Sequence, residues 1–224
     1  MRFRFVDCRY ALADHAEGRR LYLEAHIPGA AFLDLETDLS GSSPSGGRHP
    51  LPTADEFAAS ASRAGIGPDV FAVAYGNGAA RLWWLLRHFG HDDAAVIGDW
   101  HGPKRSGEER IEPATFVPHE RAGDTISAEE LAAHLPELVV LDARAPERWR
   151  GEREPIDPVA GRIPGALNWP AGTEQPPLPD GELVAYCGSG VAACELVLRS
   201  DRPVRLYAGS WSDWITHDLP IEKG

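Results

Sequence analysis

The sequence predicts an α/β fold in two tandem copies, each an open, mostly parallel sheet flanked by helices. Three observations carry this prediction. The 224 residues are enough for two domains of about 100 residues each. Short apolar runs alternate with helix-like patterns in both halves of the chain, as in a parallel sheet with crossover helices. Four motifs of the first half also recur, in the same order, in the second half.

The recurring motifs place two homologous domains along the chain. We expect a first domain over residues 1–107, a linker over 108–124 and a second domain over 125–224, because the linker has two prolines and mixed charge without a clear period. Val6-Asp7-Cys8-Arg9 recurs as Leu141-Asp142-Ala143-Arg144, Ile27-Pro28-Gly29-Ala30 as Ile163-Pro164-Gly165-Ala166, Ala74-Tyr75-Gly76 as Ala185-Tyr186-Cys187, and Ile97-Gly98-Asp99-Trp100 as Ala208-Gly209-Ser210-Trp211.

Three short runs of the second copy are expected to be strands. They are Val139–Leu141, Leu183–Tyr186 and Val204–Leu206, and such runs without strict alternation suit parallel strands that are covered on both faces. Ligands bind beyond the carboxyl ends of the strands in sheets of this kind. Gly76 and Cys187 both follow a strand there, so we expect the site at this edge.

Helix signals lie between the strands. Thr53 with Glu56, and Ser127 with Glu130, fit a capping box, in which a hydroxyl caps the first turn and a glutamate stands three residues later. Residues 79–89 have a helical pattern and are followed by a glycine, which suits a helix end.

Composition narrows the class of function. The formal net charge of −12 argues against nucleic acid or an anionic membrane as the main partner, so an anionic substrate would need a local basic patch. No stretch approaches the roughly 20 apolar residues of a membrane span. Cys8, Cys187 and Cys194 are odd in number and unevenly spaced, which favours neither a disulfide framework nor a zinc site. We therefore expect a reducing cytoplasm.

The loop after the strand that ends at Tyr186 carries the strongest chemical signal. Its two glycines allow successive N–H groups to point into one concavity, and a helix expected from Val191 to Arg199 adds positive potential at its start. We expect a thiol placed there to have a lowered pKa and to act as a nucleophile. The alternative, a small buried apolar cysteine, fits less well before a glycine-rich turn. The predicted catalytic residues are Cys187, Gly188, Ser189, Gly190, Val191 and Ala192.

A rival cysteine chemistry is disfavoured by the residues that follow the loop. Cysteine phosphatases need an arginine after five intervening residues to bind phosphate with two parallel hydrogen bonds. The corresponding residue here is Ala193, and no Arg or Lys lies between Cys187 and Leu198.

Taken together, the motifs resemble the two-domain rhodanese family of thiosulfate and 3-mercaptopyruvate sulfurtransferases. In that family only the C-terminal domain is normally catalytic, and Gly76 replaces the cysteine in the first copy, so the first domain is expected to be non-catalytic. The motifs that carry the resemblance are His26-Ile27-Pro28-Gly29-Ala30, Asp142-Ala143-Arg144, Arg148-Trp149-Arg150-Gly151, Gly161-Arg162-Ile163-Pro164-Gly165-Ala166, the Cys187 loop and Gly209-Ser210-Trp211-Ser212-Asp213-Trp214.

The resemblance implies a reaction in two halves. A thiolate on Cys187 would take sulfur from a small anionic donor, 3-mercaptopyruvate or thiosulfate, and hold it as a persulfide. A small thiol, a thioredoxin-like protein or cyanide would then accept it. The resemblance implies no metal or organic cofactor, and no nucleic-acid or membrane partner. The alternative is a carrier or binding module that receives its persulfide sulfur from a partner protein.

The resemblance also implies residues that hold the donor. Arg148 matches the arginine that binds the substrate anion, with a surface salt bridge as its alternative role. A second arginine, usual in a Glu-Pro-Arg run, is replaced by Ile156, and Arg153 or Arg162 is a candidate to compensate. Arg162 itself stands where the family has histidine, and Ala192 where threonine is common.

A proton relay is the last implied feature. Ser189 matches the loop serine of mercaptopyruvate-type enzymes, and its alternative role is that of a small turn residue. His49 matches a histidine proposed to work with serine and a carboxylate, and Glu36 stands at the carboxylate position in place of aspartate. The alternative is a solvated loop histidine and a surface glutamate. The loop type favours 3-mercaptopyruvate as donor.

Overall fold

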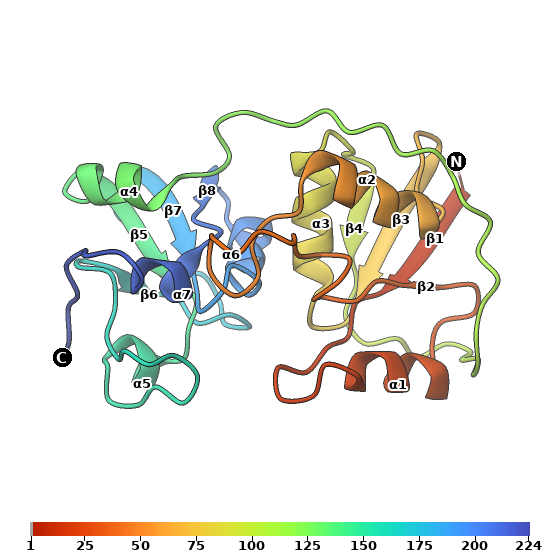
Figure 1. Ribbon diagram of the computed structural model, residues 1–224, viewed down its shortest axis with the longest axis horizontal. Helices are drawn as coiled ribbons and strands as arrows, with labels where there is room; N and C mark the ends of the chain where they lie inside the picture. The colour runs from red at the N-terminus through yellow and green to blue at the C-terminus, as the bar shows by residue number, and fades with distance from the viewer. Residues whose placement is uncertain (1) are drawn as a thin grey trace. The chain divides into compact units, whose positions relative to one another are not determined.

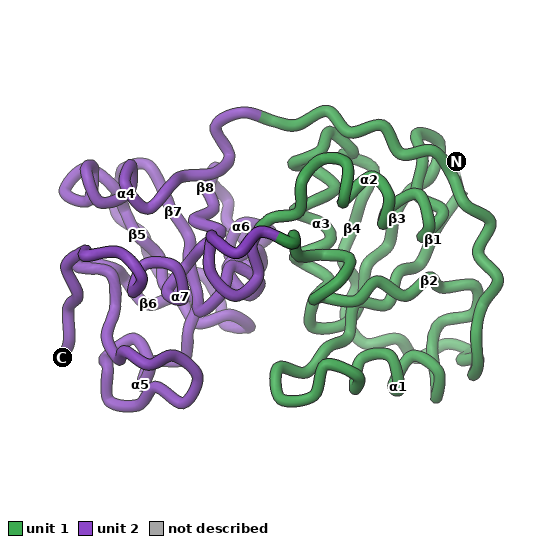
Figure 2. The backbone as a smooth tube through the Cα atoms, in the orientation of Figure 1, with its two compact units in different colours: residues 1–42, 51–121 green, residues 43–50, 122–224 purple. Residues whose placement is uncertain are grey.

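A computed structural model describes residues 2–224 and divides them into two compact units (Figures 1 and 2). Unit 1 contains the chain up to Ser42, together with Leu51–Arg121. Unit 2 contains Ala122–Gly224 and also the short segment Ser43–Pro50. No helix among the described residues is both long and apolar enough to span a membrane.

Unit 1 is built on a four-stranded parallel sheet of order β2-β1-β3-β4. Helices flank this sheet, and α3 packs against β3 and β4. The strands are β1 (Arg2–Asp7), β2 (Ala31–Phe32), β3 (Val70–Tyr75) and β4 (Ala94–Val96), and the helices are α1 (Glu17–Glu24), α2 (Ala54–Arg63) and α3 (Ala79–His88).

Unit 2 repeats the same topology, with the parallel order β6-β5-β7-β8. Each strand of unit 1 has one counterpart at the same place in this order, so the predicted tandem α/β fold is confirmed. The strands are β5 (Leu138–Asp142), β6 (Leu167–Asn168), β7 (Glu182–Tyr186) and β8 (Val204–Leu206), and the helices are α4 (Ala128–His134), α5 (Pro146–Trp149), α6 (Ala193–Arg199) and α7 (Ser210–Trp214).

The repeat extends to the register of the central strands. In unit 1 the last residue of β1, Asp7, lies opposite the last residue of β3, Tyr75. In unit 2 Asp142 lies opposite Tyr186 in the same way. The residue after each tyrosine therefore leaves the sheet at the same point, beyond the carboxyl ends of the two central strands.

The predicted helix starts are present in the structure. The Thr53 side chain accepts a hydrogen bond from the Glu56 N–H, and the Glu56 carboxylate accepts from the Thr53 N–H, which completes a capping box on α2. On α4 the Ser127 side chain accepts from the Glu130 N–H. Helix α3 ends at His88, one residue before the predicted end.

The segment expected to link the domains belongs largely to unit 1. Residues 108–121 cluster with the first unit because their backbone is hydrogen-bonded to it. The Ala114 N–H donates to the Ser62 carbonyl at 3.0 Å, and the His119 N–H donates to the Phe89 carbonyl at 3.0 Å. Unit 2 therefore resumes at Ala122, whereas the expected second domain begins at residue 125.

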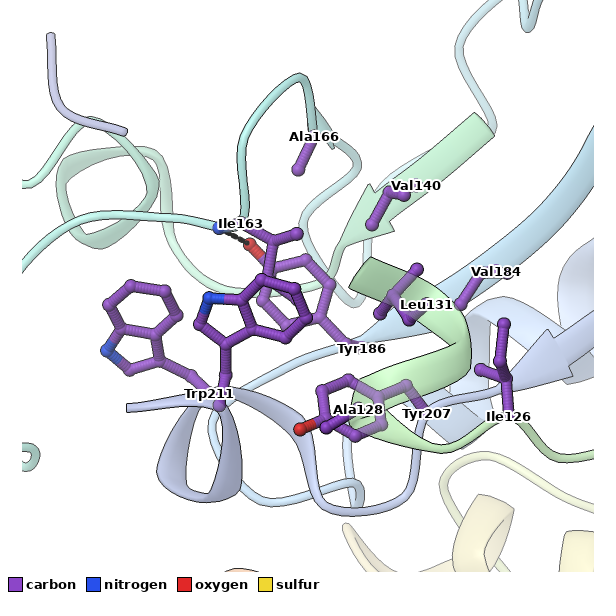
Figure 3. Packing of buried hydrophobic residues seen from close by; sticks show 11 residues of the cluster. Ile126, Ala128, Leu131, Val140, Ile163, Ala166, Val184, Tyr186, Tyr207 and Trp211 are labelled. Carbon is purple, nitrogen blue, oxygen red and sulfur yellow. Dashed lines mark hydrogen bonds between the residues drawn. The ribbon is translucent and has the colours of Figure 1, made fainter. Parts of the chain in front are cut away.

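A cluster of buried aliphatic and aromatic side chains forms the core of unit 2 (Figure 3). Tyr186, Tyr207, Trp211 and Trp214 are all buried in this cluster. The Ile163 N–H donates to the Tyr186 hydroxyl at 3.2 Å, which is the dashed contact in Figure 3. Tyr186 is thus held in the core directly before Cys187.

Candidate active site

The loop 187–192 joins β7 to α6, and one of its backbone N–H groups contacts the sulfur atom of Cys187. The Gly190 N–H donates to Sγ of Cys187 at 3.1 Å, and Cys187 is only 3% exposed. Gly190 has a φ of 79°, and a Cβ there would lie 2.2 Å from the Ala208 carbonyl oxygen. Only glycine fits this position, and its N–H is directed at the sulfur.

Helix α7 holds this loop from below through three hydrogen bonds. The Cys187 N–H donates to Oγ of Ser210 at 3.0 Å. The Trp211 N–H donates to the Cys187 carbonyl at 3.0 Å, and the Ser212 N–H donates to the Gly188 carbonyl at 2.9 Å. Ser210 has a φ of 56°, the one positive value for a non-glycine residue within 2–224. Such strain persists only where the surrounding contacts enforce it, so the loop is tightly positioned.

The other two cysteines have structural contacts. The Cys194 thiol is fully buried and donates to the Gly190 carbonyl at 3.2 Å. Cys8 lies in unit 1, where burial and the nearby Asp7 raise the pKa of its thiol well above the usual value. Cys8 is therefore protonated and inert at neutral pH.

The segment Ser43–Pro50 brings a histidine to the loop. Nδ1 of His49 lies 2.7 Å from Oγ of Ser189, and both residues are buried. The pair expected from the sequence is therefore in hydrogen-bond contact within unit 2. Glu36, the expected third member, belongs to unit 1 and pairs there with His15 at 3.6 Å.

The same segment is firmly seated on α7. The Arg48 N–H donates to Oγ of Ser212 at 3.1 Å. A Cβ on Gly47, which has a φ of 83°, would lie 2.5 Å from the Gly209 carbonyl oxygen. This close approach of two backbones requires glycine, and it sets Arg48 and His49 beside the loop.

A chain of alternating charges begins in the sheet of unit 2. The Asp142 carboxylate accepts from Nε and Nη2 of Arg144 at 2.7–3.1 Å and from the Tyr186 hydroxyl at 2.5 Å. Nη1 of Arg144 in turn donates to Glu154 at 3.4 Å. Burial raises the pKa of Tyr186 well above its usual value, and the adjacent Asp142 charge adds to this effect. Tyr186 therefore acts as a hydrogen-bond donor throughout the neutral range.

The chain continues to two guanidinium groups beside the loop. Arg148 binds Glu154 at 2.8 Å and Asp157 at 3.1 Å, and Asp157 also pairs with Arg48. We call the series Asp142, Arg144, Glu154, Arg148, Asp157 and Arg48 the charge ladder. Glu154 and Asp157 each lie between two arginines, and Asp142 pairs with Arg144, so these ion pairs offset the desolvation cost of the buried carboxylates.

The end of the charge ladder reaches the backbone of the loop. A Cβ built on Gly188 would lie 3.0 Å from Nη2 of Arg48 and 3.4 Å from Nη1 of Arg148. Among residues 2–224, no group accepts a hydrogen bond from Nη1 of Arg148 or Nη2 of Arg48. Two arginines thus offer N–H groups to an anion next to Cys187.

Arg162 is engaged elsewhere. Its guanidinium donates to the Trp149 and Gly224 carbonyls, pairs with Glu222 and stacks on the Trp149 ring at 4.3 Å. All of these partners lie outside loop 187–192. The structure therefore brings Arg148 to the loop and anchors Arg162 to the C-terminal segment.

Sequence reasoning missed Arg48, Glu154 and Asp157. One signal was available, because Arg48 directly precedes His49 and shares its loop. Glu154 and Asp157 are the first and last residues of the run Glu154-Pro155-Ile156-Asp157, and nothing in the run itself indicates that they bind Arg148. No group of three or more His, Cys, Asp or Glu within the described residues is arranged to hold a metal ion.

The ladder predicts an acid-sensitive fold. Burial alone would raise the pKa of Glu154, but hydrogen bonds from Arg148 and from the Asp157 and Ile156 N–H groups lower it below its ordinary value. The stabilisation is present above the unfolded-state pKa of about 4.3 and is lost as pH falls through the lower folded value. We expect the urea midpoint of the wild type to fall with acidification below about pH 4.3.

Glu154→Gln tests this expectation. The variant should lose about 3 kcal/mol at neutral pH, because two arginines lose a buried partner, and its urea midpoint should depend less on pH in the acid range. Glu152→Gln is the matched control, since Glu152 pairs with Arg150 on the surface and its loss should leave the midpoint unchanged. Equal pH dependence in Glu154→Gln and the wild type would contradict the assignment.

Comparison with known proteins decides the family. The Rhodanese-like domain family matches residues 127–217, which contain the loop and most of the charge ladder. The chain is 44% identical to a Pseudomonas aeruginosa protein named "Probable 3-mercaptopyruvate sulfurtransferase", over 98% of this chain and 92% of that protein. This chain belongs to the rhodanese family of sulfurtransferases. It is therefore a sulfur-transferring enzyme of a family whose general mechanism uses a persulfide.

Other relatives of this sulfurtransferase agree on the family and differ in the donor that they are named for. A Mycobacterium tuberculosis protein with a name of the thiosulfate sulfurtransferase type is 35% identical over 98% of this chain and 90% of its own length. The solved structure of a Leishmania major 3-mercaptopyruvate sulfurtransferase is 29% identical, with a TM-score of 0.79 over 96% of this chain and 70% of that one.

Proposed function

We propose that this sulfurtransferase takes sulfur from 3-mercaptopyruvate, carries it as a persulfide on Cys187 and passes it to a thiol. One observation carries the proposal: the guanidinium groups of Arg48 and Arg148 both lie beside Gly188 and offer N–H groups that no described residue accepts. A carboxylate bound there would sit next to the thiol, with its reactive sulfur within reach of Cys187.

The first half-reaction balances without a cofactor. The Cys187 thiolate attacks the donor sulfur, a new S–S bond forms and the C–S bond breaks, and the electron pair goes to the departing carbon. The proton of the donor thiol ends on that carbon, which gives pyruvate and an ionised persulfide. The Gly190 N–H, which already donates to the Cys187 sulfur, supports the negative charge.

Ser189 and His49 provide the route for that proton. Their side chains are hydrogen-bonded at 2.7 Å, and Ser189 is part of the loop itself. A hydroxyl both donates and accepts, so it can take a proton from the donor thiol and return one to the carbon. In the second half-reaction an acceptor thiolate attacks the outer sulfur and releases Cys187 as a thiolate.

The charge of the ladder favours a monoanion as donor. Its three arginines are balanced by three carboxylates, and residues 188–192 carry no charged side chain. A single carboxylate can be held by the outward N–H groups, whereas the second charge of thiosulfate finds no further cation. In a partly buried site an unmatched charge is costly.

Acceptors and location extend the same proposal. A small thiol or a thioredoxin-like protein suits the second half-reaction, with cyanide as a laboratory substitute. A cytoplasmic location is supported by three cysteines that are all free, since reducing compartments keep thiols in this state. The alternative, a carrier that receives sulfur from a partner protein, would have no use for two outward arginines beside its thiol.

Steady-state kinetics with both donors tests the proposal. With cyanide as acceptor, kcat/KM for 3-mercaptopyruvate should exceed that for thiosulfate by about tenfold or more, which corresponds to about 1.4 kcal/mol of preference. The reverse preference would overturn the proposed donor. Turnover with neither donor, together with persulfide uptake from a protein donor, would establish the carrier instead.

A further inference from the structure

A cavity of about 520 Å³ opens in unit 1 at the place that corresponds to loop 187–192 of unit 2. It lies beyond the carboxyl ends of β1 and β3, and Gly76, the counterpart of Cys187, lines it. Volumes of a few hundred Å³ are typical of small-molecule sites, which in sheets of this kind lie at this edge. The cavity therefore lies where a ligand site is expected, although glycine replaces cysteine at position 76.

The Asp–Arg ion pair that follows the first central strand is present in both units, but its arginine is buried in unit 2 and partly exposed in unit 1. Arg144 is 1% exposed, lies over the Trp211 ring at 4.7 Å and uses Nη1 on Glu154. Its counterpart Arg9 is bound to Asp7 in the same way, but its side chain is 27% exposed and lines the cavity. Within residues 2–224, nothing accepts a hydrogen bond from Nη1 of Arg9.

The corresponding tryptophans of the two units have different contacts. Trp100 is the repeat counterpart of Trp211, but it packs on Phe5, with ring centroids 5.6 Å apart. Its Nε1–H donates to the Pro103 carbonyl at 2.9 Å. The space above the Arg9 guanidinium is therefore left open, and Trp100 forms one of its walls.

A lysine completes the cationic side of the cavity. Lys104 lines it and is one of only two lysines in the chain, so it is one of the few ammonium groups available to a ligand. Its position is set by the next residue, because Arg105 and His26 exchange two backbone hydrogen bonds of 2.9 Å. Asp99 lines the same cavity and limits the negative charge that it can accept.

We propose that this cavity binds a small organic carboxylate with a flat apolar body. The carboxylate takes the Nη1 hydrogen bond of Arg9 and the charge of Lys104, and the apolar body lies against Trp100 and Ile97. A monoanion is favoured over a dianion because Asp7 already neutralises Arg9 and Asp99 repels a second charge. Gly76 offers no nucleophile, so the ligand is bound and not converted.

The test uses benzoate as probe and benzyl alcohol as its uncharged analogue, titrated in ligand-detected NMR. We expect benzoate to bind in the millimolar range and benzyl alcohol to bind at least about tenfold more weakly, since it has no charge for Arg9 and Lys104. Gly98→Phe should abolish binding, because Gly98 lines the cavity and a Cβ there meets no atom within 4 Å.

Two charge variants and one site variant complete the test. Lys104→Gln should weaken benzoate binding about two- to fivefold, whereas Lys223→Gln, which removes the other lysine, should not change it. Arg148→Gln should also leave binding unchanged. Sulfur transfer should be normal in Gly98→Phe and Lys104→Gln, so failure here is separate from failure of the proposed function.

Three results would overturn the proposal. They are no benzoate binding to the wild type, unchanged binding in both Gly98→Phe and Lys104→Gln, and loss of binding in Arg148→Gln, which would place the probe beside Cys187 instead.

Discussion

Cys187→Ser is expected to remove sulfur transfer completely while the protein stays folded. The substitution keeps the size of the side chain, but a serine hydroxyl is un-ionised at neutral pH and cannot attack sulfur as a thiolate does. Transfer to cyanide should fall to background with either donor. Intact-protein mass spectrometry after donor treatment should show one added sulfur atom on the wild type and none on the variant.

Cys194→Ser is the matched control for this result. Its thiol donates to the Gly190 carbonyl at 3.2 Å, and a serine hydroxyl can make the same contact. We expect the variant to retain most of its activity and to gain the sulfur atom. Activity that survives in Cys187→Ser and is lost in Cys194→Ser would show that the nucleophile has been assigned to the wrong cysteine.

The second large effect is expected from the two arginines at the loop. Arg148→Gln should lower kcat/KM for 3-mercaptopyruvate by about ten- to hundredfold, because a charged hydrogen bond to a partly buried anion contributes about 1.5–3 kcal/mol. Arg48→Gln should lower it by about tenfold, since Arg48 is more exposed than Arg148. The combined variant should lose less than the product of the two, as both groups hold one carboxylate.

Two further arginine variants serve as controls for this prediction. Arg150→Gln removes an exposed arginine that pairs with Glu152, and it should leave kcat/KM unchanged. Arg162→Gln should act on stability, because its partners are Trp149, Glu222 and Gly224. A larger loss of kcat/KM in Arg162→Gln than in Arg48→Gln would show that Arg162, and not Arg48, is the second arginine that binds the donor.

The tandem fold and the thiol loop were predictable because their signals are local. Motifs such as Asp142-Ala143-Arg144 recur because one backbone geometry needs the same residues in both copies. Asp7 and Asp142 each end a central strand, and each binds the arginine two residues later. The glycine at 190 could be recognised in the same way, since a tight turn and a positive φ restrict the choice of residue.

The charge ladder was not predictable because it joins residues that are distant in the chain. Arg48 meets Asp157 across 109 residues, and His49 meets Ser189 across 140. Periodicity and capping describe neighbours along the chain, and neither shows that residues 43–50 fold with the second copy. Residues 108–121 likewise look irregular in sequence, and their hydrogen bonds to unit 1 join residues that are distant in the chain.

The segment Ser43–Pro50 has a consequence for the ancestry of the chain. Duplication of a gene leaves two copies that recombination can later separate, lose or exchange one at a time. In this chain the second copy cannot be separated from the first without loss. A gene fragment that begins after the first copy would encode the Cys187 loop without Arg48 and His49. Selection on the second copy therefore also acts on residues 43–50, which are encoded within the first copy and supply Arg48 and His49.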